Sequence, residues 1–225
     1  GIRPLVIGKL GNSYILASET CALDIVNAKF IREVENGEMI VVENNELKSF
    51  KPFNKMKPRP CVFEYIYFAR PDSILNGECA YEYRKRLGEE LARESGVKAD
   101  IVVPVPDSGV PAAIGYSQSS KLNFELGLIR NHYVGRTFIE PTQNIRSLGV
   151  KLKLSSTKSI LKNKSIILID DSLVRGTTCH KIVKMLYESG AKEVHVRIAC
   201  PEIKYPDFYG VDMPTKNELL AHRKN

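Results

Sequence analysis

Two adjacent carboxylates, Asp170 and Asp171, follow an apolar run at residues 166–169. An apolar run without polar alternation is typical of a strand that is buried on both faces. Neighbouring carboxylates at the end of such a strand are costly unless a cation or hydroxyl donors meet them. The pair therefore predicts a ligand with hydroxyl groups, such as a ribose, or a magnesium ion.

A second group of residues follows the acidic pair in the same loop. Gly176, Thr177 and Thr178 open a predicted helix, so that backbone N–H groups, hydroxyls and a helix N-terminus converge on one point. This combination predicts a phosphate site, and together with the carboxylates it indicates a phosphorylated ribose. The alternative for the loop taken alone is a tight strand-to-helix turn that is capped by acids.

The hydrophobic pattern predicts the scaffold that positions these residues. Strand, helix and strand alternate, which predicts an α/β fold with a parallel sheet and helices on both faces. Arg84, Leu87 and Leu91 share one stripe of the first helix. Ligands of such sheets bind beyond the carboxyl ends of the strands, which here means the loops after Val105 and Ile169. The expected strands are 101–105, 166–169 and a strand from 194 onward, and the expected helices are 81–94, 110–119 and 178–189.

The N-terminal part has a different character. Short strands are expected at residues 5–8, 14–17 and 39–42, separated by turn signals. From Lys48 to Pro60 the chain carries five basic residues, three prolines and no acidic residue. This composition predicts an extended linker, because like charges repel and proline stiffens the chain. A nucleic-acid patch is the weaker alternative, since no aromatic-rich basic repeat accompanies it.

Composition limits the class of protein. The 225 residues correspond to one and a half domains at about 150 residues each. With 43% apolar and 26% charged residues, the chain is globular, and disorder or a collagen-like fold is excluded. No apolar window is long enough to cross a membrane. The net charge of +7 indicates an anionic partner, and five cysteines without a Cys-x-x-Cys pair indicate reduced thiols in the cytoplasm.

The stretch from Ile166 to Thr178 resembles the phosphoribosyl pyrophosphate (PRPP) motif of type I phosphoribosyltransferases. The residue sequence from Asp170 to Thr178 closely resembles that of one family, the glutamine PRPP amidotransferases or amidophosphoribosyltransferases. The resemblance implies a type I phosphoribosyltransferase fold, with a mainly parallel sheet flanked by helices, after a short β-rich remnant of an N-terminal-nucleophile glutaminase domain. Four further stretches agree in order: residues 63–73, 104–108, 133–139 and 209–214.

The resemblance also implies roles for individual residues. Asp170 and Asp171 would hold the ribose hydroxyls and assist a magnesium ion, for which Ser108 is the third metal-associated residue. The loop from Pro106 to Ser108 corresponds to the pyrophosphate loop of the family. The implied PRPP contacts are Asp107, Ser108, Arg130, Tyr133, Arg136, Asp170, Asp171, Ser172, Leu173, Val174, Arg175, Gly176, Thr177 and Thr178.

The stretch from Arg130 to Lys153 corresponds to a flap of the family that closes over PRPP. Lys151 and Lys153 are further candidates for pyrophosphate contacts, and a solvated basic loop is the alternative without the resemblance. The family usually has Lys-Asn-Arg-Tyr before the Val-Gly-Arg of this stretch, whereas His132 replaces the arginine here. An arginine is always charged and histidine is not, so one phosphate contact is in question.

The implied reaction is the first step of purine synthesis, in which PRPP and ammonia give 5-phosphoribosylamine and pyrophosphate. The implied partners are PRPP, ammonia, magnesium and purine nucleotides that inhibit at the same site, and the implied assembly is a homo-oligomer, either a dimer or a tetramer. No side-chain nucleophile is needed for this step. The alternative is an inactive remnant or regulator that binds PRPP or a nucleotide without converting it.

The resemblance divides the chain into residues 1–50 as the tail of the glutaminase domain, 51–60 as the linker and 61–225 as a C-terminally incomplete phosphoribosyltransferase domain. The catalytic cysteine of the glutaminase is expected to be absent, and Cys21 is expected to be a packed thiol. Cys61 matches an iron–sulfur ligand in some members, but Asp207 lies at a second ligand position. No cluster is therefore expected, because one cysteine cannot hold four irons.

Overall fold

The computed structural model describes residues 2–54, 57–132, 153–209 and 215–223. The contacts divide the chain into two compact units, Gly1–Tyr83 and Arg84–Asn225. In the part of the chain that the structure describes, no helix is long and apolar enough to cross a membrane.

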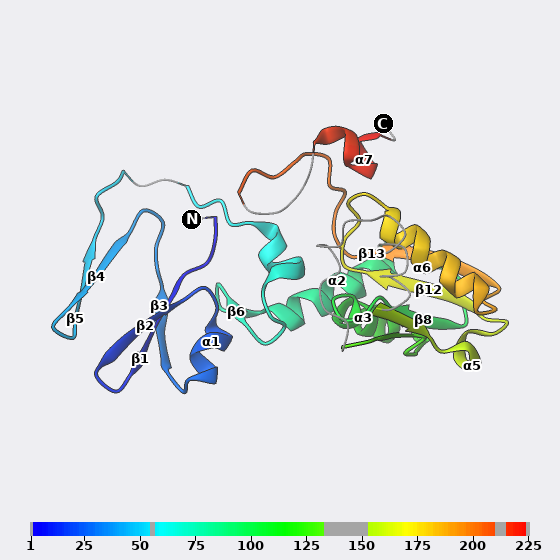
Figure 1. The fold of residues 1–225 in the computed structure, drawn as a ribbon, viewed down its shortest axis with the longest axis horizontal. Coiled ribbons are helices and arrows are strands. Elements are labelled where there is room, and N and C mark those ends of the chain that lie inside the picture. The colour runs from blue at the N-terminus through cyan, green and yellow to red at the C-terminus, as the bar shows by residue number, and fades with distance from the viewer. Residues whose placement is uncertain (1, 55–56, 133–152, 210–214, 224–225) are drawn as a thin grey trace. The chain divides into compact units, whose positions relative to one another are not determined.

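The first unit is built on an antiparallel sheet of three strands in the order β2-β1-β3. These strands are the blue arrows of Figure 1. Val6 and Leu23 are almost fully buried and form its small core with Ala28. β4 and β5 form a separate antiparallel hairpin. The elements are β1 (Val6–Leu10), β2 (Ser13–Ala17), α1 (Thr20–Ile25), β3 (Lys29–Glu33), β4 (Met39–Glu43) and β5 (Glu46–Phe50).

The basic run from Lys48 to Pro60 begins inside a strand, whereas the expected linker of residues 51–60 begins after it and remains a prediction. Lys48 lies in β5 and pairs with Glu43 at 3.0 Å, and Lys51 pairs with Glu35 at 2.7 Å. The sequence pattern missed this strand because its charged side chains interrupt the alternation of apolar and polar residues. The acidic partners of Lys48 and Lys51 lie on the neighbouring strand and in the loop before it. The basic run is therefore partly neutralised by local ion pairs.

The first unit continues past residue 60 with η1 (Glu64–Phe68), a π-helix, and with a hairpin of β6 (Ile74–Leu75) and β7 (Glu78–Cys79). The Glu19 carboxylate accepts hydrogen bonds from the Arg70 backbone N–H at 2.8 Å and the Ser73 hydroxyl at 2.7 Å. These bonds connect the later segment to the start of α1. The domain boundary that was expected at residue 60 remains a prediction, while the structural division lies at Tyr83.

The second unit contains a fully parallel sheet of four strands in the order β13-β12-β8-β9. This confirms the predicted α/β fold with a parallel sheet. The strands are β8 (Ile101–Pro104), β9 (Asn123–Phe124), β12 (Ser165–Asp170) and β13 (Glu193–Ile198).

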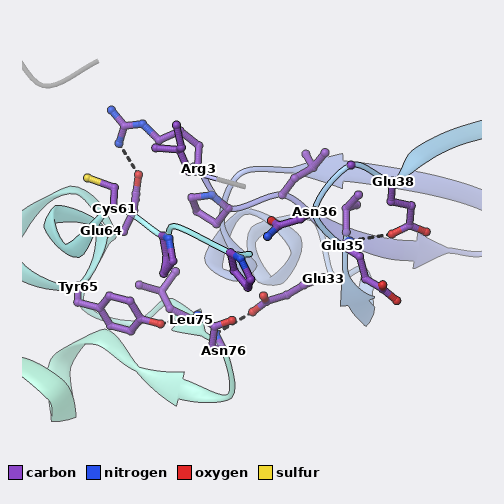
Figure 2. A pocket seen from close by; sticks show the side chains of 17 residues that line it. Arg3, Glu33, Glu35, Asn36, Glu38, Cys61, Glu64, Tyr65, Leu75 and Asn76 are labelled. Carbon is purple, nitrogen blue, oxygen red and sulfur yellow. Dashed lines mark hydrogen bonds and ion pairs between the residues drawn. The ribbon is translucent and has the colours of Figure 1, made fainter. Parts of the chain in front are cut away.

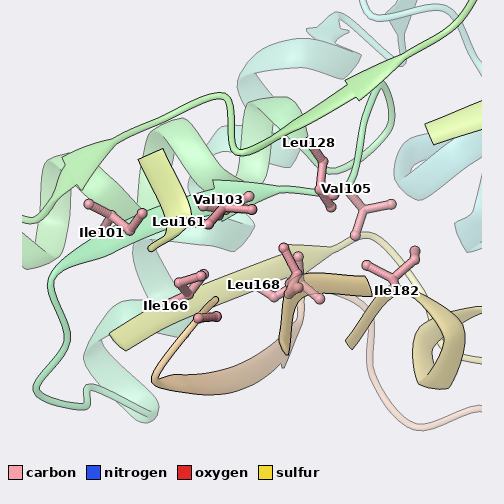
Figure 3. Close-up of a cluster of buried hydrophobic side chains, with 10 residues drawn as sticks. Ile101, Val103, Val105, Leu128, Leu161, Ile166, Leu168 and Ile182 are labelled. Carbon is pink, nitrogen blue, oxygen red and sulfur yellow. The ribbon is translucent and has the colours of Figure 1, made fainter. Parts of the chain in front are cut away.

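Helices cover both faces of this sheet. The strands β8 and β12 carry apolar side chains on each face, and these side chains pack against the helices. Val103 and Leu168 face α6 (Thr177–Glu188), where they pack with Ile182 in the cluster of Figure 3. Val102 and Ile167 face the other way, toward α2 (Ala80–Glu94) and α3 (Val110–Ser120). Figure 1 shows α6 and α3 on opposite sides of the sheet.

Shorter elements complete the second unit. β10 (Leu128–Arg130) and β11 (Leu154–Ser156) pair antiparallel, and α5 (Lys158–Leu161) leads into β12. Near the end of the chain lie η3 (Lys216–Glu218), a 3-10 helix, and α7 (Leu220–Arg223).

Candidate functional site

The carboxyl ends of β8 and β12 lie side by side. Pro104 is opposite Ile169 in the parallel register, and the Val105 N–H donates to the Ile169 carbonyl oxygen at 2.8 Å. The two loops that the sequence singled out therefore leave the same edge of the sheet as neighbours. Ligand sites of α/β sheets form at such an edge.

Gly109 allows the two loops to approach each other. A Cβ atom at this position would lie 2.6 Å from the Ile169 carbonyl oxygen and 2.9 Å from that of Val105. Both neighbours are backbone atoms, which cannot move away as a flexible side chain could. Only glycine therefore fits between the strand ends without separating them.

The acidic pair lies where the two loops meet. Asp171 is only 7% exposed, and its carboxylate accepts hydrogen bonds from the hydroxyls of Ser172 and Ser108. The Asp170 carboxylate accepts from the Asp171 backbone N–H at 2.9 Å. The structure thus brings together the three residues that were predicted to hold magnesium: Ser108, Asp170 and Asp171.

The surroundings of the pair oppose its ionisation. Burial, followed by the negative charge of Asp171, raises the pKa of Asp170 to about 7. Burial also raises the pKa of Asp171, although the hydroxyls of Ser108 and Ser172 favour its charged form. A cation or a polyhydroxyl ligand would relieve this cost, as the sequence argument expected.

Arg84 is a residue of this site that the sequence argument missed. It lies on α2, is 5% exposed, and its positive charge lowers the pKa of Asp171. The sequence pattern assigned it to the apolar stripe of the helix with Leu87 and Leu91. The available signal was the arginine itself, because a charge on a buried stripe requires a carboxylate or other acceptor nearby.

The predicted phosphate loop ends at the start of α6. Gly176 precedes the helix with a φ of 80°, a left-handed conformation that favours glycine. The first N–H groups of a helix have no partner within the helix and carry a partial positive charge. Thr177 and Thr178 are exposed there, so hydroxyl and backbone donors are available to an anion at the helix N-terminus.

The remaining loop residues are held mainly by protein contacts. Leu173 and Val174 are half-buried, and the Val174 carbonyl oxygen accepts from the Leu220 N–H at 2.9 Å. The Arg175 Nε–H donates to the Glu218 carboxylate at 2.7 Å. Their contacts with PRPP remain predictions.

Part of the predicted flap is described. The Arg130 guanidinium on β10 forms an ion pair with Asp107 at 2.7 Å, which links the predicted flap to the predicted pyrophosphate loop. The Lys153 carbonyl oxygen accepts from the Asn131 N–H at 2.8 Å, and His132 is exposed in a turn. Tyr133, Arg136 and Lys151 lie outside the described residues.

A separate cavity of about 280 Å³ lies in the first unit, lined by residues of that unit alone (Figure 2). Among its carboxylates, Glu64 pairs with Arg3, Glu33 accepts from the Asn76 N–H at 2.7 Å, and Glu35 pairs with Lys51 at 2.7 Å. None of the predicted PRPP contacts lines this cavity. It is therefore not part of the predicted site.

Cys61 and Asp207, which lie at positions of iron–sulfur ligands in some members of the family, take part in local hydrogen bonds. The Cys61 N–H donates to the Ile2 carbonyl oxygen at 3.1 Å, and the Asp207 carboxylate accepts from the Tyr209 N–H at 2.6 Å. Cys21 is buried, and burial raises the pKa of its thiol. A raised pKa lowers the fraction of reactive thiolate, which fits a packed thiol.

Comparison with known proteins identifies close relatives. The chain is 57% identical to the amidophosphoribosyltransferase of Rhizobium etli, covering 99% of this chain and 46% of that protein. It is 54% identical to the chloroplastic amidophosphoribosyltransferase of Glycine max, covering 99% of this chain and 39% of that protein. The chain therefore spans less than half the length of these relatives.

A solved structure agrees with the sequence relatives. The glutamine PRPP amidotransferase from Bacillus subtilis, complexed with ADP and GMP, matches with a TM-score of 0.90 and 50% identity, covering 99% of this chain and 49% of that one. The profile of the phosphoribosyl transferase domain matches residues 72–206, which include both loops of the site. The resemblance predicted from the sequence is thus confirmed, and the chain belongs to the phosphoribosyl transferase domain family.

Proposed function

We propose that this chain is the PRPP-converting portion of an amidophosphoribosyltransferase, which forms 5-phosphoribosylamine and pyrophosphate from PRPP and ammonia. The observation that carries the proposal is the arrangement of two loops at one sheet edge. One loop supplies the shielded carboxylates of Asp170 and Asp171 and the amides at the start of α6, and the other supplies Asp107 and Ser108. The identity of at least 54% to the two named amidophosphoribosyltransferases supports this choice of reaction.

PRPP has three parts, and the site offers a matching group for each. Asp170 and Asp171 would accept hydrogen bonds from the ribose hydroxyls. The loop from Ser172 to Thr178 would bind the 5-phosphate through backbone N–H groups and hydroxyls. Asp107 and Ser108, with Arg130, Tyr133 and Arg136 of the flap, would bind the pyrophosphate.

The donor set fits magnesium. Two carboxylates and a hydroxyl are oxygen ligands, and Mg²⁺ is commonly held by one or two carboxylates together with substrate phosphates and water. Ser108, Asp170 and Asp171 would hold the ion, and bound magnesium would supply positive charge to the leaving pyrophosphate.

The reaction needs positioning more than covalent chemistry. The nitrogen of ammonia forms a bond to C1 of the ribose while the bond from C1 to the pyrophosphate oxygen breaks, and the new amine then loses a proton to water. Arg130 and the other cationic flap residues would stabilise the negative charge that builds on the pyrophosphate. Closure of the flap would exclude water, which otherwise hydrolyses PRPP.

Purine nucleotides are proposed inhibitors at the same site because they carry the same ribose 5-phosphate group as PRPP. The Bacillus subtilis relative was solved with ADP and GMP, which supports this choice of ligand class. A homo-oligomer, dimer or tetramer, is proposed from the family resemblance. Reduced thiols and a cytoplasmic location are proposed from the cysteine pattern.

We also propose that the chain carries no iron–sulfur cluster, since Asp207 replaces a cysteine at a ligand position of cluster-bearing relatives. Protein that is prepared without oxygen should contain no stoichiometric iron or acid-labile sulfide. About four irons per chain would overturn this proposal.

The test of the proposed function combines binding and turnover. Protein is incubated with PRPP, magnesium and an ammonium salt at alkaline pH, and phosphoribosylamine is assayed against the Asp170→Asn variant. The wild type should form product, and the variant should form little. Tight PRPP binding in a calorimeter without product formation would instead indicate a PRPP-sensing regulator, and absence of binding would overturn the proposal entirely.

A further inference from the structure

The end of the described chain contacts the predicted phosphate loop. We call residues 216–223, which form η3 and α7, the C-terminal clasp. The Leu220 N–H donates to the Val174 carbonyl oxygen at 2.9 Å, and the Glu218 carboxylate accepts from the Arg175 Nε–H at 2.7 Å. The Arg223 Nη2 donates to the Arg175 carbonyl oxygen at 3.4 Å. Figure 1 shows α7 above the loop that leads into α6.

An apolar contact adds to these polar ones. A Cβ atom built on Gly176 would lie 3.3 Å from the Leu220 Cδ2 atom, so the Leu220 side chain packs against the glycine that opens α6. Gly176 is the residue with a φ of 80° at the turn into the helix. The clasp therefore touches the loop at three consecutive residues: Val174, Arg175 and Gly176.

The clasp has its own anchors in the second unit. Leu219 is fully buried, with no exposed side-chain surface. The Lys216 ammonium lies 5.4 Å from the centre of the Tyr205 ring, within range of a cation–π contact. Because the contact between Lys216 and Tyr205 does not involve the phosphate loop, it ties the clasp to another segment of the second unit, and the clasp can act as a support for the loop.

The hydrogen bond to Val174 also orients a donor. In a trans peptide the carbonyl oxygen and the following N–H point in opposite directions. When the Val174 carbonyl is turned toward Leu220, the Arg175 N–H points away from the clasp. A loop whose amides are already oriented binds an anion better, because it loses less conformational freedom on binding.

We propose that the C-terminal clasp positions the loop at residues 174–176 for the 5-phosphate, with Glu218 and Leu220 as positioning residues. This inference rests on the proposed function, since it assigns a 5-phosphate to this loop. The Glu218 contact uses one of the five N–H donors of Arg175, and it fixes the direction of the guanidinium.

Three variants separate the contacts. Leu220→Ala removes the side chain over Gly176 and keeps the N–H. Leu220→Pro also removes the N–H, and proline suits this position because Leu220 is the first residue of α7 and Leu219 has an extended backbone at φ −77° and ψ 122°. Glu218→Gln breaks the ion pair. Glu90→Gln is the matched control, because it breaks an exposed pair of the same 2.7 Å length on α2.

The measurements are KM for PRPP and kcat in the ammonia-dependent reaction, and calorimetric Kd values for ribose 5-phosphate and for inorganic pyrophosphate. We expect KM for PRPP and Kd for ribose 5-phosphate to rise about threefold in Glu218→Gln and about tenfold in Leu220→Pro, with Leu220→Ala between wild type and Leu220→Pro. The kcat and the Kd for pyrophosphate should stay within about twofold of wild type. The control should match wild type throughout.

The outcomes distinguish this inference from the proposed function. If wild-type protein binds PRPP but the clasp variants bind ribose 5-phosphate as tightly as wild type, the clasp does not position the loop. Equal weakening for pyrophosphate, or a lowered melting temperature that accounts for the loss, would also overturn the inference. Wild-type protein that binds no PRPP would overturn the proposed function instead.

Discussion

At the scale of single residues, Asp170 has the property with the clearest consequence. Its pKa is raised to about 7, first by burial and then by the charge of Asp171. The ionised form is the one that can accept two hydroxyl hydrogen bonds or bind a cation. Ligand binding through Asp170 should therefore depend on pH near neutrality.

We predict that the affinity for PRPP with magnesium rises between pH 6 and pH 8, as Asp170 loses its proton. PRPP itself titrates near pH 6 through the second ionisation of its phosphate. The Asp170→Asn variant retains the phosphate titration and lacks the carboxyl titration, so its affinity should be weaker and should change less with pH. Calorimetric titrations at several pH values would measure both, and parallel pH profiles for the two proteins would contradict the assigned role.

The same residue predicts a change in stability without ligand. Because the pKa of folded Asp170 lies above the ordinary value of 3.8, its neutral form favours the folded state, and that contribution is lost as pH rises from about 4 through 7. Asp170→Asn stays neutral throughout. Its melting temperature should exceed that of wild type at pH 8 and approach it at pH 4, and a difference that is larger at pH 4 would refute the assignment.

Arg84 carries the third prediction at this scale. Arg84→Met removes a buried cation whose charge favours ionised Asp171, and we expect a loss on the order of 3 kcal/mol in the free energy of unfolding at pH 8. In an Asp171→Asn background the same change should cost less, because the Asp171 charge that Arg84 compensates is gone. Urea unfolding of the wild type, the two single variants and the double variant measures the coupling between Arg84 and Asp171. Strictly additive losses in the free energy of unfolding would show that Arg84 does not act through Asp171.

The site itself was largely predictable from residue types. Adjacent carboxylates and the Gly-Thr-Thr run identified the loop after β12 as a candidate site. The pattern of parallel strands predicted that the loop with Ser108 leaves the same edge of the sheet. The sequence could not place Arg84 beside Asp171. The apolar stripe of a helix predicts which side of the helix is buried, but it does not predict which strand end that side contacts. The partners of Arg175 in the clasp were equally hidden, since 43 residues separate Arg175 from Glu218.

At the scale of elements, the geometry of the site depends on how closely the loop after β8 approaches the carboxyl end of β12. Gly109 is the residue that permits it, with two backbone oxygens within 2.9 Å of the position a Cβ would take. A methyl group there must push the loop with Asp107 and Ser108 away from Asp171. The two halves of the site would then no longer converge.

Gly109→Ala should therefore lower the free energy of unfolding by about 1–3 kcal/mol, the usual cost of overpacking, and should also raise KM for PRPP. Gln118→Ala, at an exposed position of the helix that follows, is the control and should change neither quantity. Denaturant unfolding and steady-state kinetics provide the measurements. Wild-type behaviour of Gly109→Ala would mean that the loops need not approach each other.

The elements of the second unit followed their sequence pattern more closely than those of the first. Buried parallel strands and amphipathic helices have strong periodicity, and α2, α3 and α6 begin within one residue of the expected positions. In the first unit, β3 (Lys29–Glu33) and β5 were missed. Their side chains are mostly exposed, so apolar and polar residues do not alternate along them.

At the scale of the whole molecule, the chain combines a phosphoribosyl transferase domain with a β-rich unit. The division of the structure at Tyr83 and the family match that starts at residue 72 differ. Arg70 and Ile74 donate backbone hydrogen bonds to Glu19 and Thr20 at the start of α1, which ties this segment to the first unit. Two lysines of the basic run at 48–60, Lys48 and Lys51, are paired with Glu43 and Glu35. The anion that we propose as the ligand of the second unit is a phosphorylated ribose.

The most direct test of this conclusion follows the new bond. PRPP, magnesium and ¹⁵N-labelled ammonium are supplied to the protein at alkaline pH, and NMR detects whether ¹⁵N becomes attached to C1 of the ribose while pyrophosphate is released in equal amount. We predict ¹⁵N-labelled phosphoribosylamine with wild-type protein and almost none with Asp170→Asn. Unchanged PRPP, or ribose 5-phosphate formed without ¹⁵N at the same rate in both proteins, would contradict the proposed function.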